Sequence, residues 1–340
     1  MGPLETVRSR TDDVLERFLS EERDEIEAAH PGFVPLLDEV IRLVRSGGKR
    51  LRPAFCFWGY RAAGGEDNDA ILRVGAGLEL FHTFALIHDD VMDRGETRRG
   101  EPTVHVRMAK ERGGADAEQF AISAAILAGD LASVLGDHLF TTSGFPPELL
   151  LRAFRRYNHM RIEVAVGQFL DISGAGREVG EDEARRISLL KSGSYTVQGP
   201  LAVGSILGGG DPELLHALEA YGEPLGEAFQ LRDDLAGALG GDLDQAKPTA
   251  LLAAARRLAS PQDRAFLDEH VGRGPLEGDD GTRVHEILRA SGAVAETERR
   301  AGELVDRARQ ALAGTPIAAE PAAALGELAE AVRPGPGESG

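Results

Sequence analysis

The sequence predicts an all-α protein, and three observations carry this expectation. Apolar residues recur every three or four positions over most of the 340-residue chain, as at Ile71, Val74, Leu78 and Phe81. No run of strictly alternating apolar and polar residues marks a strand. The breaks between apolar stripes contain glycine and proline and are short enough to be turns between packed helices; they lie near 62–66, 143–147, 208–212 and 273–281.

Apolar stripes of helical period define the expected elements in order. We expect a single helical domain over residues 13–333. Residues 1–12 are polar, and the PGPGESG tail at 334–340 has little apolar surface to bury, so we expect both ends to be disordered. The expected helices cover 33–45, 71–85, 120–135, 149–173, 183–207, 213–236, 248–258, 283–312 and 320–333.

The composition is that of a globular protein, with 42% hydrophobic and 28% charged residues. No uninterrupted apolar run reaches the roughly 18 to 20 residues that a membrane span needs, and the N-terminus lacks the order of a signal peptide. We therefore expect a cytoplasmic protein without stable membrane insertion. Cys56 is the one cysteine, which excludes an intramolecular disulfide and indicates a small core residue.

The net charge of −18 argues against nucleic acid or an anionic membrane as the main partner, because such binding is driven by clustered cations. An anionic substrate must instead be held by local basic residues. Only four of the 38 basic residues are lysines, which indicates positions that require a compact ammonium, although chance retention is the alternative. They are Lys49, Lys110, Lys191 and Lys247.

Adjacent aspartates occur four times, at 12–13, 89–90, 233–234 and 279–280. The first and last pairs lie in polar stretches and are interpreted as solvated surface. The other two pairs lie at the ends of the amphipathic stretches LFHTFALIHDDVMD and GEAFQLRDDLAG. Their carboxylates are therefore placed where the apolar helix face ends.

The first of these clusters has the spacing of a magnesium site. On a helix Asp89 and Asp93 stand one turn apart on the same face, and Asp90 is offset by about 100°. Magnesium prefers oxygen ligands from one or two carboxylates, with water and phosphate oxygens in the other positions, whereas zinc would favour nearby cysteine. A solvated helix end explains either cluster alone; the two clusters together favour metal binding.

Basic residues follow glycines in two loops. Arg98 and Arg99 lie in RGETRRGEPTVH, and Lys49, Arg50 and Arg52 lie in SGGKRLRP. Glycine lets the backbone and its cations approach an anion closely. Together with the aspartates, these loops describe a cavity suited to two substrates that both carry a diphosphate.

The chain resembles the trans-isoprenyl diphosphate synthases, the polyprenyl synthetase family, over roughly residues 33–333. The resemblance is carried by GGKRLRP, by HDDVMD followed by RRG, by LAGD at 127–130, by GQFLD at 167–171 and by FQLRDD at 229–234. It implies long helices around a deep cavity, a homodimer, and head-to-tail condensation of isopentenyl diphosphate with allylic diphosphates. It also implies three Mg²⁺ ions that bridge both aspartate motifs to the allylic diphosphate.

The resemblance assigns roles to individual residues, and Lys110 receives none. Metal would be bound by Asp89, Asp93 and Asp233. Asp171, Asp90 and Asp234 would support the metal site, either at the metal ions or through contacts to their ligands. Isopentenyl diphosphate would be held by Lys49, Arg52, His82 and Arg99, although His82 by itself is typical of a core histidine. The allylic diphosphate would be held by Arg98, Lys191, Ser192, Gln230 and Lys247.

The second aspartate motif departs from the family pattern. Gly237 occupies the place of its third aspartate, a variant that the family also uses. The following GALGGDLDQAKPT is shorter than the family's segment and lacks another diphosphate-binding lysine. The usual Lys–Thr pair is Lys191–Ser192 here, which keeps the hydroxyl.

Product length is predicted from the residues before the first motif. Phe84 lies five positions before Asp89, one and a half helical turns away, and is followed by the small Ala85. With no insertion inside DDVMD, this pattern is most similar to a geranylgeranyl diphosphate synthase in which Phe84 floors the cavity. A farnesyl diphosphate synthase is the alternative, and ordinary core packing is the alternative for Phe84.

Two other functions remain open. A class I terpene cyclase shares the ionisation chemistry but carries an Asn/Ser/Glu metal motif, and neither Asn68 nor Asn158 starts that pattern. A non-catalytic subunit of a heteromeric synthase is favoured by the altered second motif. It is opposed by the complete first motif and by Lys49, Arg98 and Arg99.

Overall fold

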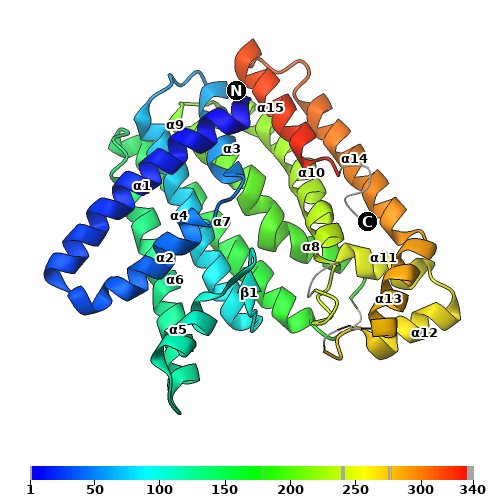
Figure 1. The fold of residues 1–340 in the computed structure, drawn as a ribbon. Helices are drawn as coiled ribbons and strands as arrows, with labels where there is room; N and C mark the ends of the chain where they lie inside the picture. Colours follow the sequence, from blue (N-terminus) through cyan, green and yellow to red (C-terminus); the bar gives the residue numbers. More distant parts are fainter. Residues whose placement is uncertain (1, 178, 239–241, 275, 277, 335–340) are drawn as a thin grey trace. The chain divides into compact units, whose positions relative to one another are not determined.

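The computed structural model confirms the all-α prediction (Figure 1). It describes residues 2–177, 179–238, 242–274, 276 and 278–334. Within these ranges the regular elements are helical apart from one short antiparallel hairpin, which pairs Thr97 with Pro102 and Arg98 with Glu101. The chain forms two compact units, one of residues 1–57 and 66–150, the other of residues 58–65 and 151–340. A single domain over 13–333 stays a prediction.

The first unit is built around the packing of α4 on α6, with α1 on α4 and with α2 and α5 on α6. Helix α4 begins at Asn68, whose side chain accepts a hydrogen bond from the Ile71 N–H, and it buries an apolar face that runs to Ile87. The elements are α1 (Pro3–Ala29), η1 (Pro31–Phe33), α2 (Val34–Arg45), the start of α3 (Leu51–Ala62), α4 (Asp69–Met92), β1 (Thr97–Arg98), β2 (Glu101–Pro102), α5 (Val104–Arg112), α6 (Ala117–Thr141) and the start of α7 (Pro147–Gly174).

The second unit is built around α10, which packs on α14 and on the π-helical segment η2. Helix α10 has Asp211 as its N-cap and Pro212 in its first turn, both strong start signals. After α7 the elements are α8 (Glu181–Ser188), η2 (Leu189–Gln198), α9 (Gly199–Leu207), α10 (Pro212–Gly237), α11 (Ala250–Leu258), α12 (Pro261–His270), α13 (Gly278–Ala290), α14 (Ala293–Ala311) and α15 (Ala319–Val332).

Two expectations about the elements are wrong. Residues 3–12 were expected to be disordered but form the first turns of α1, where Val7 and Thr11 are buried and the polar residues occupy the outer face. The stretch 283–312 is broken at Gly292, whose φ of 88° ends one helix and precedes α14. Of the predicted disordered tail, residues 335–340 lie outside the described residues.

Two helices among the described residues are apolar on average, although neither contains an uninterrupted apolar run of the length that a membrane span needs. Helices α4 and α6 each contain an 18-residue window of mean hydropathy 1.5, long and apolar enough by composition to cross a membrane. The α4 window is 67% buried within the protein, so packing accounts for most of its apolar surface. The α6 window is 50% buried.

Paired glycines allow the closest helix contacts in both units. A Cβ placed on Gly77 of α4 would lie 2.7 Å from the Gly136 carbonyl oxygen of α6, and one on Gly136 would lie 2.8 Å from that of Gly77. In the second unit Gly193 of η2 and Gly226 of α10 meet in the same reciprocal way, at 2.9 and 2.8 Å. The helices that end in the two aspartate clusters are therefore each packed backbone to backbone against a neighbour.

We expect Gly77→Ala to destabilise the protein by about 1–3 kcal/mol, because the new methyl group must push α4 away from the α6 backbone. Chemical denaturation measures the effect. Gly326→Ala in α15 is the matched control, since a Cβ there meets nothing within 4 Å. Alanine should stabilise that helix by about 0.5–1 kcal/mol. A Gly77→Ala protein as stable as the parent would contradict the backbone contact.

Candidate functional site

A buried arginine fixes the glycine loop of the first unit. Arg50 has a φ of 50° and a 5% exposed side chain. Its guanidinium bonds to Asp12 of α1 at 2.7 Å, to Glu79 of α4 at 2.9 Å and to the Val44 carbonyl at 2.8 Å. Arg50 therefore ties three helices together and has a structural role.

The second basic loop folds onto this glycine loop. Arg99 donates to the Ser46 hydroxyl at 3.2 Å and to the Gly47 carbonyl. A Cβ on Gly48 would lie 3.3 Å from the Arg50 guanidinium and 3.4 Å from that of Arg99. Because Gly48 has no side chain, the guanidinium groups of Arg50 and Arg99 can both lie next to it.

His82 of α4 lies among these cations. Burial holds its pKa well below the ordinary value, and the charges of Arg52, Arg99, Arg98 and Arg50 lower it further. The imidazole is thus neutral near pH 7 and can donate one hydrogen bond without adding charge. Burial also lowers the pKa of Arg99. Arg52, Arg98 and Arg99 therefore lie close enough for their charges to act on His82, while the predicted roles of these residues in substrate binding stay predictions.

The first aspartate cluster lies at the C-terminal end of α4, beside the same arginines. Asp90 is buried and accepts hydrogen bonds from the Arg98 Nε at 2.9 Å and from its terminal nitrogen at 2.6 Å. The same nitrogen of Arg98 lies 3.6 Å from Asp89. Burial raises the pKa of Asp90 while Arg98 opposes the shift. Asp93 is the C-cap residue, so the three carboxylates occupy the last turn.

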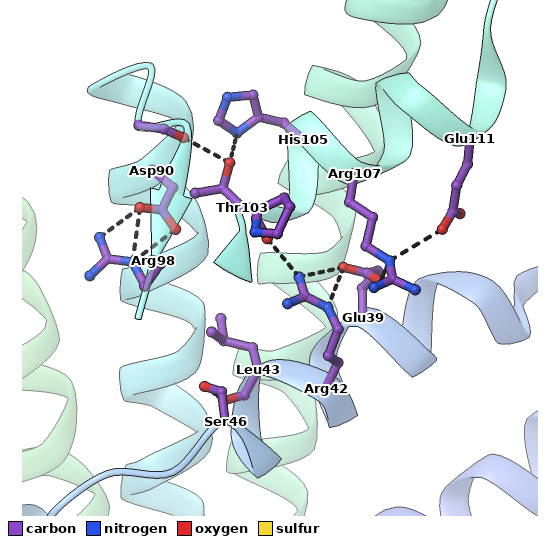
Figure 2. A network of polar contacts seen from close by, with 12 residues as sticks. Glu39, Arg42, Leu43, Ser46, Asp90, Arg98, Thr103, His105, Arg107 and Glu111 are labelled. Carbon is purple, nitrogen blue, oxygen red and sulfur yellow. Dashed lines mark hydrogen bonds and ion pairs between the residues drawn. The ribbon is translucent and has the colours of Figure 1, made fainter. Parts of the chain in front are cut away.

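The hairpin that carries Arg98 is held by a polar network (Figure 2). The Thr103 hydroxyl donates to the Gly95 carbonyl at 2.7 Å, and Arg42 of α2 donates to the Pro102 carbonyl at 3.2 Å. Arg42 and Arg107 share the buried carboxylate of Glu39, at 2.7 and 2.9 Å. This support was not predicted from the sequence. An acidic residue inside the apolar stripe at 33–45 was the available signal.

The LAGD motif packs against the first aspartate motif. A Cβ on Gly129 would lie 2.2 Å from the His88 ring, and the His88 Nε2 lies 3.0 Å from the Ile126 carbonyl. This contact orients the histidine that precedes Asp89. Phe84, the predicted floor, is half-buried, with its ring centroid 5.4 Å from that of Phe81 and 4.6 Å from that of His88.

In the second unit, the GQFLD motif packs against the Lys191–Ser192 pair at Gly167, which has no side chain. A Cβ on Gly167 of α7 would lie 2.2 Å from the Lys191 backbone nitrogen in η2. The Lys191 ammonium donates to the buried Asp171 carboxylate at 2.6 Å. Ser192 follows in the same π-helical segment, a local structure that is frequent at functional sites.

The second aspartate cluster contains one buried and one exposed carboxylate. Asp233 is exposed, whereas Asp234 accepts from the Gln230 side-chain amide and from the Ala250 N–H, both at 2.9 Å. Burial raises the pKa of Asp234 to about 7, with the two hydrogen bonds acting against the shift and Asp242 and Asp233 adding to it. Asp234 therefore joins α10 to the start of α11.

A carboxylate lies beside the place where the motif has glycine. A Cβ on Gly237 would lie 1.9 Å from the Asp242 Oδ2. The Lys247 ammonium lies 3.5 Å from the other oxygen of Asp242, and the Lys247 N–H donates to the Asp242 carbonyl at 3.0 Å. Asp242 and Lys247 therefore lie at the end of α10.

The donor groups fit magnesium held jointly with a substrate. Among the described residues, no three His, Cys, Asp or Glu side chains form a ready metal cage. Magnesium rarely uses such cages, since it binds through one or two carboxylates and keeps water and phosphate oxygens as its other ligands. Asp89 and Asp93 on one helical turn supply such a partial set.

Comparisons with known proteins agree on one family. The polyprenyl synthetase model matches residues 34–288. A geranylgeranyl pyrophosphate synthase from Corynebacterium glutamicum, solved with isoprenyl diphosphate and magnesium, is 34% identical, with a TM-score of 0.89 over 97% of this chain and 98% of that one.

Two curated relatives are similar at the sequence level. A short-chain isoprenyl diphosphate synthase of Methanothermobacter thermautotrophicus is 32% identical over 77% of this chain and 80% of that protein. A farnesyl diphosphate synthase of Geobacillus stearothermophilus is 31% identical over 69% of this chain and 79% of that protein. The chain belongs to the polyprenyl synthetase family and is a prenyltransferase of the short-chain polyprenyl diphosphate synthase class.

Proposed function

We propose that this protein condenses isopentenyl diphosphate head-to-tail with allylic diphosphates to give geranylgeranyl diphosphate. The observation that carries the proposal is the cluster of guanidinium groups around neutral His82, on the same helix that ends in Asp89, Asp90 and Asp93. A cationic recess beside an acidic turn suits a substrate diphosphate on one side and a metal-bound diphosphate on the other.

The first unit would hold isopentenyl diphosphate. Lys49, Arg52 and Arg99 would pair with its phosphate oxygens, and His82 would donate one uncharged hydrogen bond. Arg50 supports this binding indirectly, because its ion pairs with Asp12 and Glu79 keep the glycine loop in place. Partial desolvation lowers the pKa of the Arg99 guanidinium, and the charge of an incoming anion would offset that cost.

The family resemblance assigns the allylic diphosphate and its metal ions to residues that occur in each unit. Asp89, Asp93 and Asp233 would be the metal ligands, with Asp171 and Asp234 in support. Three Mg²⁺ ions, when bound, would neutralise the departing diphosphate. The Corynebacterium relative, solved with isoprenyl diphosphate and magnesium, supports this assignment. The residues that would hold the leaving group are the cations Arg98, Lys191 and Lys247, together with the neutral Ser192 through its hydroxyl and Gln230 through its amide.

The protein's own groups would then complete the reaction. Positive charge around the diphosphate stabilises its departure, and apolar walls exclude water from the allylic cation. The isopentenyl double bond attacks that cation, and a proton is lost to the released diphosphate. A class I cyclase and a non-catalytic subunit are less favoured, because the basic residues and both acidic clusters of a synthase are present.

We also propose a cytoplasmic homodimer. Helix α6 exposes Phe120, Leu127 and Val134 at seven-residue spacing, with relative exposures of 38%, 55% and 64%. Such a stripe on one helix face matches the packing surface that a second copy would cover.

The proposed reaction is tested by incubating purified protein with Mg²⁺, isopentenyl diphosphate and each of the C5, C10 and C15 allylic diphosphates. We expect elongation of every primer to geranylgeranyl diphosphate, identified by chain length against standards. Chelation of Mg²⁺ should abolish the product, since the departing diphosphate loses its counterions. A cyclised hydrocarbon would favour the cyclase, and no elongation with any primer would exclude a catalytic synthase.

We expect Phe84→Ala to lengthen the product, because the half-buried ring would no longer block the growing chain. Chromatography of the dephosphorylated products measures the change. Ala85→Phe is the opposing variant and should shorten the product. Unchanged chain length in Phe84→Ala, with the thermal unfolding temperature confirming a folded protein, would leave Phe84 as a packing residue only.

We propose that Asp242 provides the carboxylate that Gly237 lacks. Asp242→Asn should raise the Mg²⁺ concentration for half-maximal activity by about tenfold. Asp244→Asn is the control from the same loop, because Asp244 accepts the Leu276 N–H at 2.8 Å and has a structural contact. It should lower the thermal unfolding temperature and leave the Mg²⁺ requirement unchanged. An equal Mg²⁺ response in both variants would refute the role of Asp242.

A further inference from the structure

A buried glutamate of α10, Glu227, lies between two partly exposed arginines and forms an ion triad with them. The Glu227 carboxylate is 4% exposed and pairs with Arg185 of α8 at 2.7 Å and with Arg300 of α14 at 2.8 Å. Each arginine bonds to a different carboxylate oxygen. A buried carboxylate is stable in this setting because two guanidinium groups compensate its lost hydration.

The triad shares a helix face with the residues of the proposed site. Glu227, Gln230 and Asp234 follow one another at three- and four-residue spacing, which places their side chains in one row along α10. The Gln230 amide nitrogen donates to the Asp234 Oδ1 at 2.9 Å. This bond fixes which way the amide faces, because a carboxylate can accept only from the nitrogen end.

The opposite end of the Gln230 amide faces a cavity. Among the described residues, the Gln230 Oε1 and the Arg185 Nε are buried atoms without a hydrogen-bond partner. Both residues line a cavity of about 10 Å³, measured as the space open to the centre of a water molecule. Ser188, Glu227, Ala250 and Arg300 also line it. A polar cavity of about 10–15 Å³ is large enough for one water molecule.

We propose that one buried water joins Arg185 to Gln230 and that the Arg185–Glu227 pair thereby positions the second aspartate cluster. The water accepts a hydrogen bond from the Arg185 Nε–H and donates one to the Gln230 Oε1. This one water would give both the Arg185 Nε and the Gln230 Oε1 a hydrogen-bond partner, and a buried polar atom without one is costly. Glu227 holds Arg185, the water holds the oxygen end of Gln230, and the nitrogen end of Gln230 holds Asp234. Arg185 and Glu227 are positioning residues, whereas Arg300 compensates the charge on the other Glu227 oxygen. This inference rests on the proposed function of Gln230 and the aspartates.

The lysine variants of the two arginines separate this relay from general stability. Arg185→Lys keeps a cation beside Glu227 but removes the Nε–H that faces the cavity, whereas Arg300→Lys makes the same change on the other carboxylate oxygen. We expect Arg185→Lys to lower kcat with the allylic diphosphate by about tenfold, in the range of supporting residues at metal sites. Arg300→Lys should change kcat by less than about twofold. Equal losses in the two variants would overturn the relay.

A double-mutant cycle tests whether Arg185 acts through Gln230. In a Gln230→Ala background no amide remains to be oriented, so adding Arg185→Lys should change kcat by less than about twofold. A loss as large as in the parent background would show that Arg185 acts by another route. Thermal unfolding of all four proteins verifies that each is folded.

A crystal structure of the purified protein tests the water without any assay. We expect electron density for one water within hydrogen-bond distance of the Arg185 Nε and the Gln230 Oε1, and its loss in Arg185→Lys. An empty cavity, or a reversed Gln230 amide, would overturn the inference even in an active enzyme. A parent protein that makes no prenyl diphosphate but contains this water would instead refute the proposed function and retain the positioning contact.

Discussion

The close contact between helix backbones at paired glycines is the constraint on which both units depend. Gly77 and Gly136 bring α4 onto α6, and Gly193 and Gly226 bring η2 onto α10. In each pair, a methyl group on either residue would lie under 3 Å from the opposite carbonyl oxygen. These contacts fix the depth at which α4 and α10 are buried. Because the aspartates lie near the ends of those helices, the same contacts determine where the carboxylates emerge.

Polar support is then built outward from these helices by buried ion pairs. In the first unit Arg50 joins α1, α2 and α4, and Glu39 holds two arginines beside the hairpin of Arg98. In the second unit Glu227 holds Arg185 and Arg300. Removing one partner from such a pair leaves an uncompensated buried charge, which is costly. Each network therefore holds its loop or helix in one arrangement, which suits a site that must present charges at fixed positions.

Some of the candidate site followed from local sequence, and some did not. Helical periodicity located α4 and α10, and the spacing of Asp89, Asp90 and Asp93 placed them on one turn. Arg50 was predicted from its loop to approach an anion. In the structure it instead ties helices together through Asp12 and Glu79. Its partners Asp12 and Glu79 are 38 and 29 residues away in sequence, beyond the reach of any local pattern. The first turns of α1 were missed because a polar outer face hides a narrow buried stripe at Val7 and Thr11.

The sequence by itself determined the helical fold, the two acidic clusters and the basic loops, because each depends on residues within a few helical turns of one another. Tertiary structure decided which charged side chains form internal ion pairs and which can contact a substrate. The pKa of His82 is lowered because its ring is buried and because arginines from separate segments lie near it, and Asp242 lies beside Gly237. Such contacts join residues whose separation in the chain carries no periodic signal, so they are determined only when the helices pack.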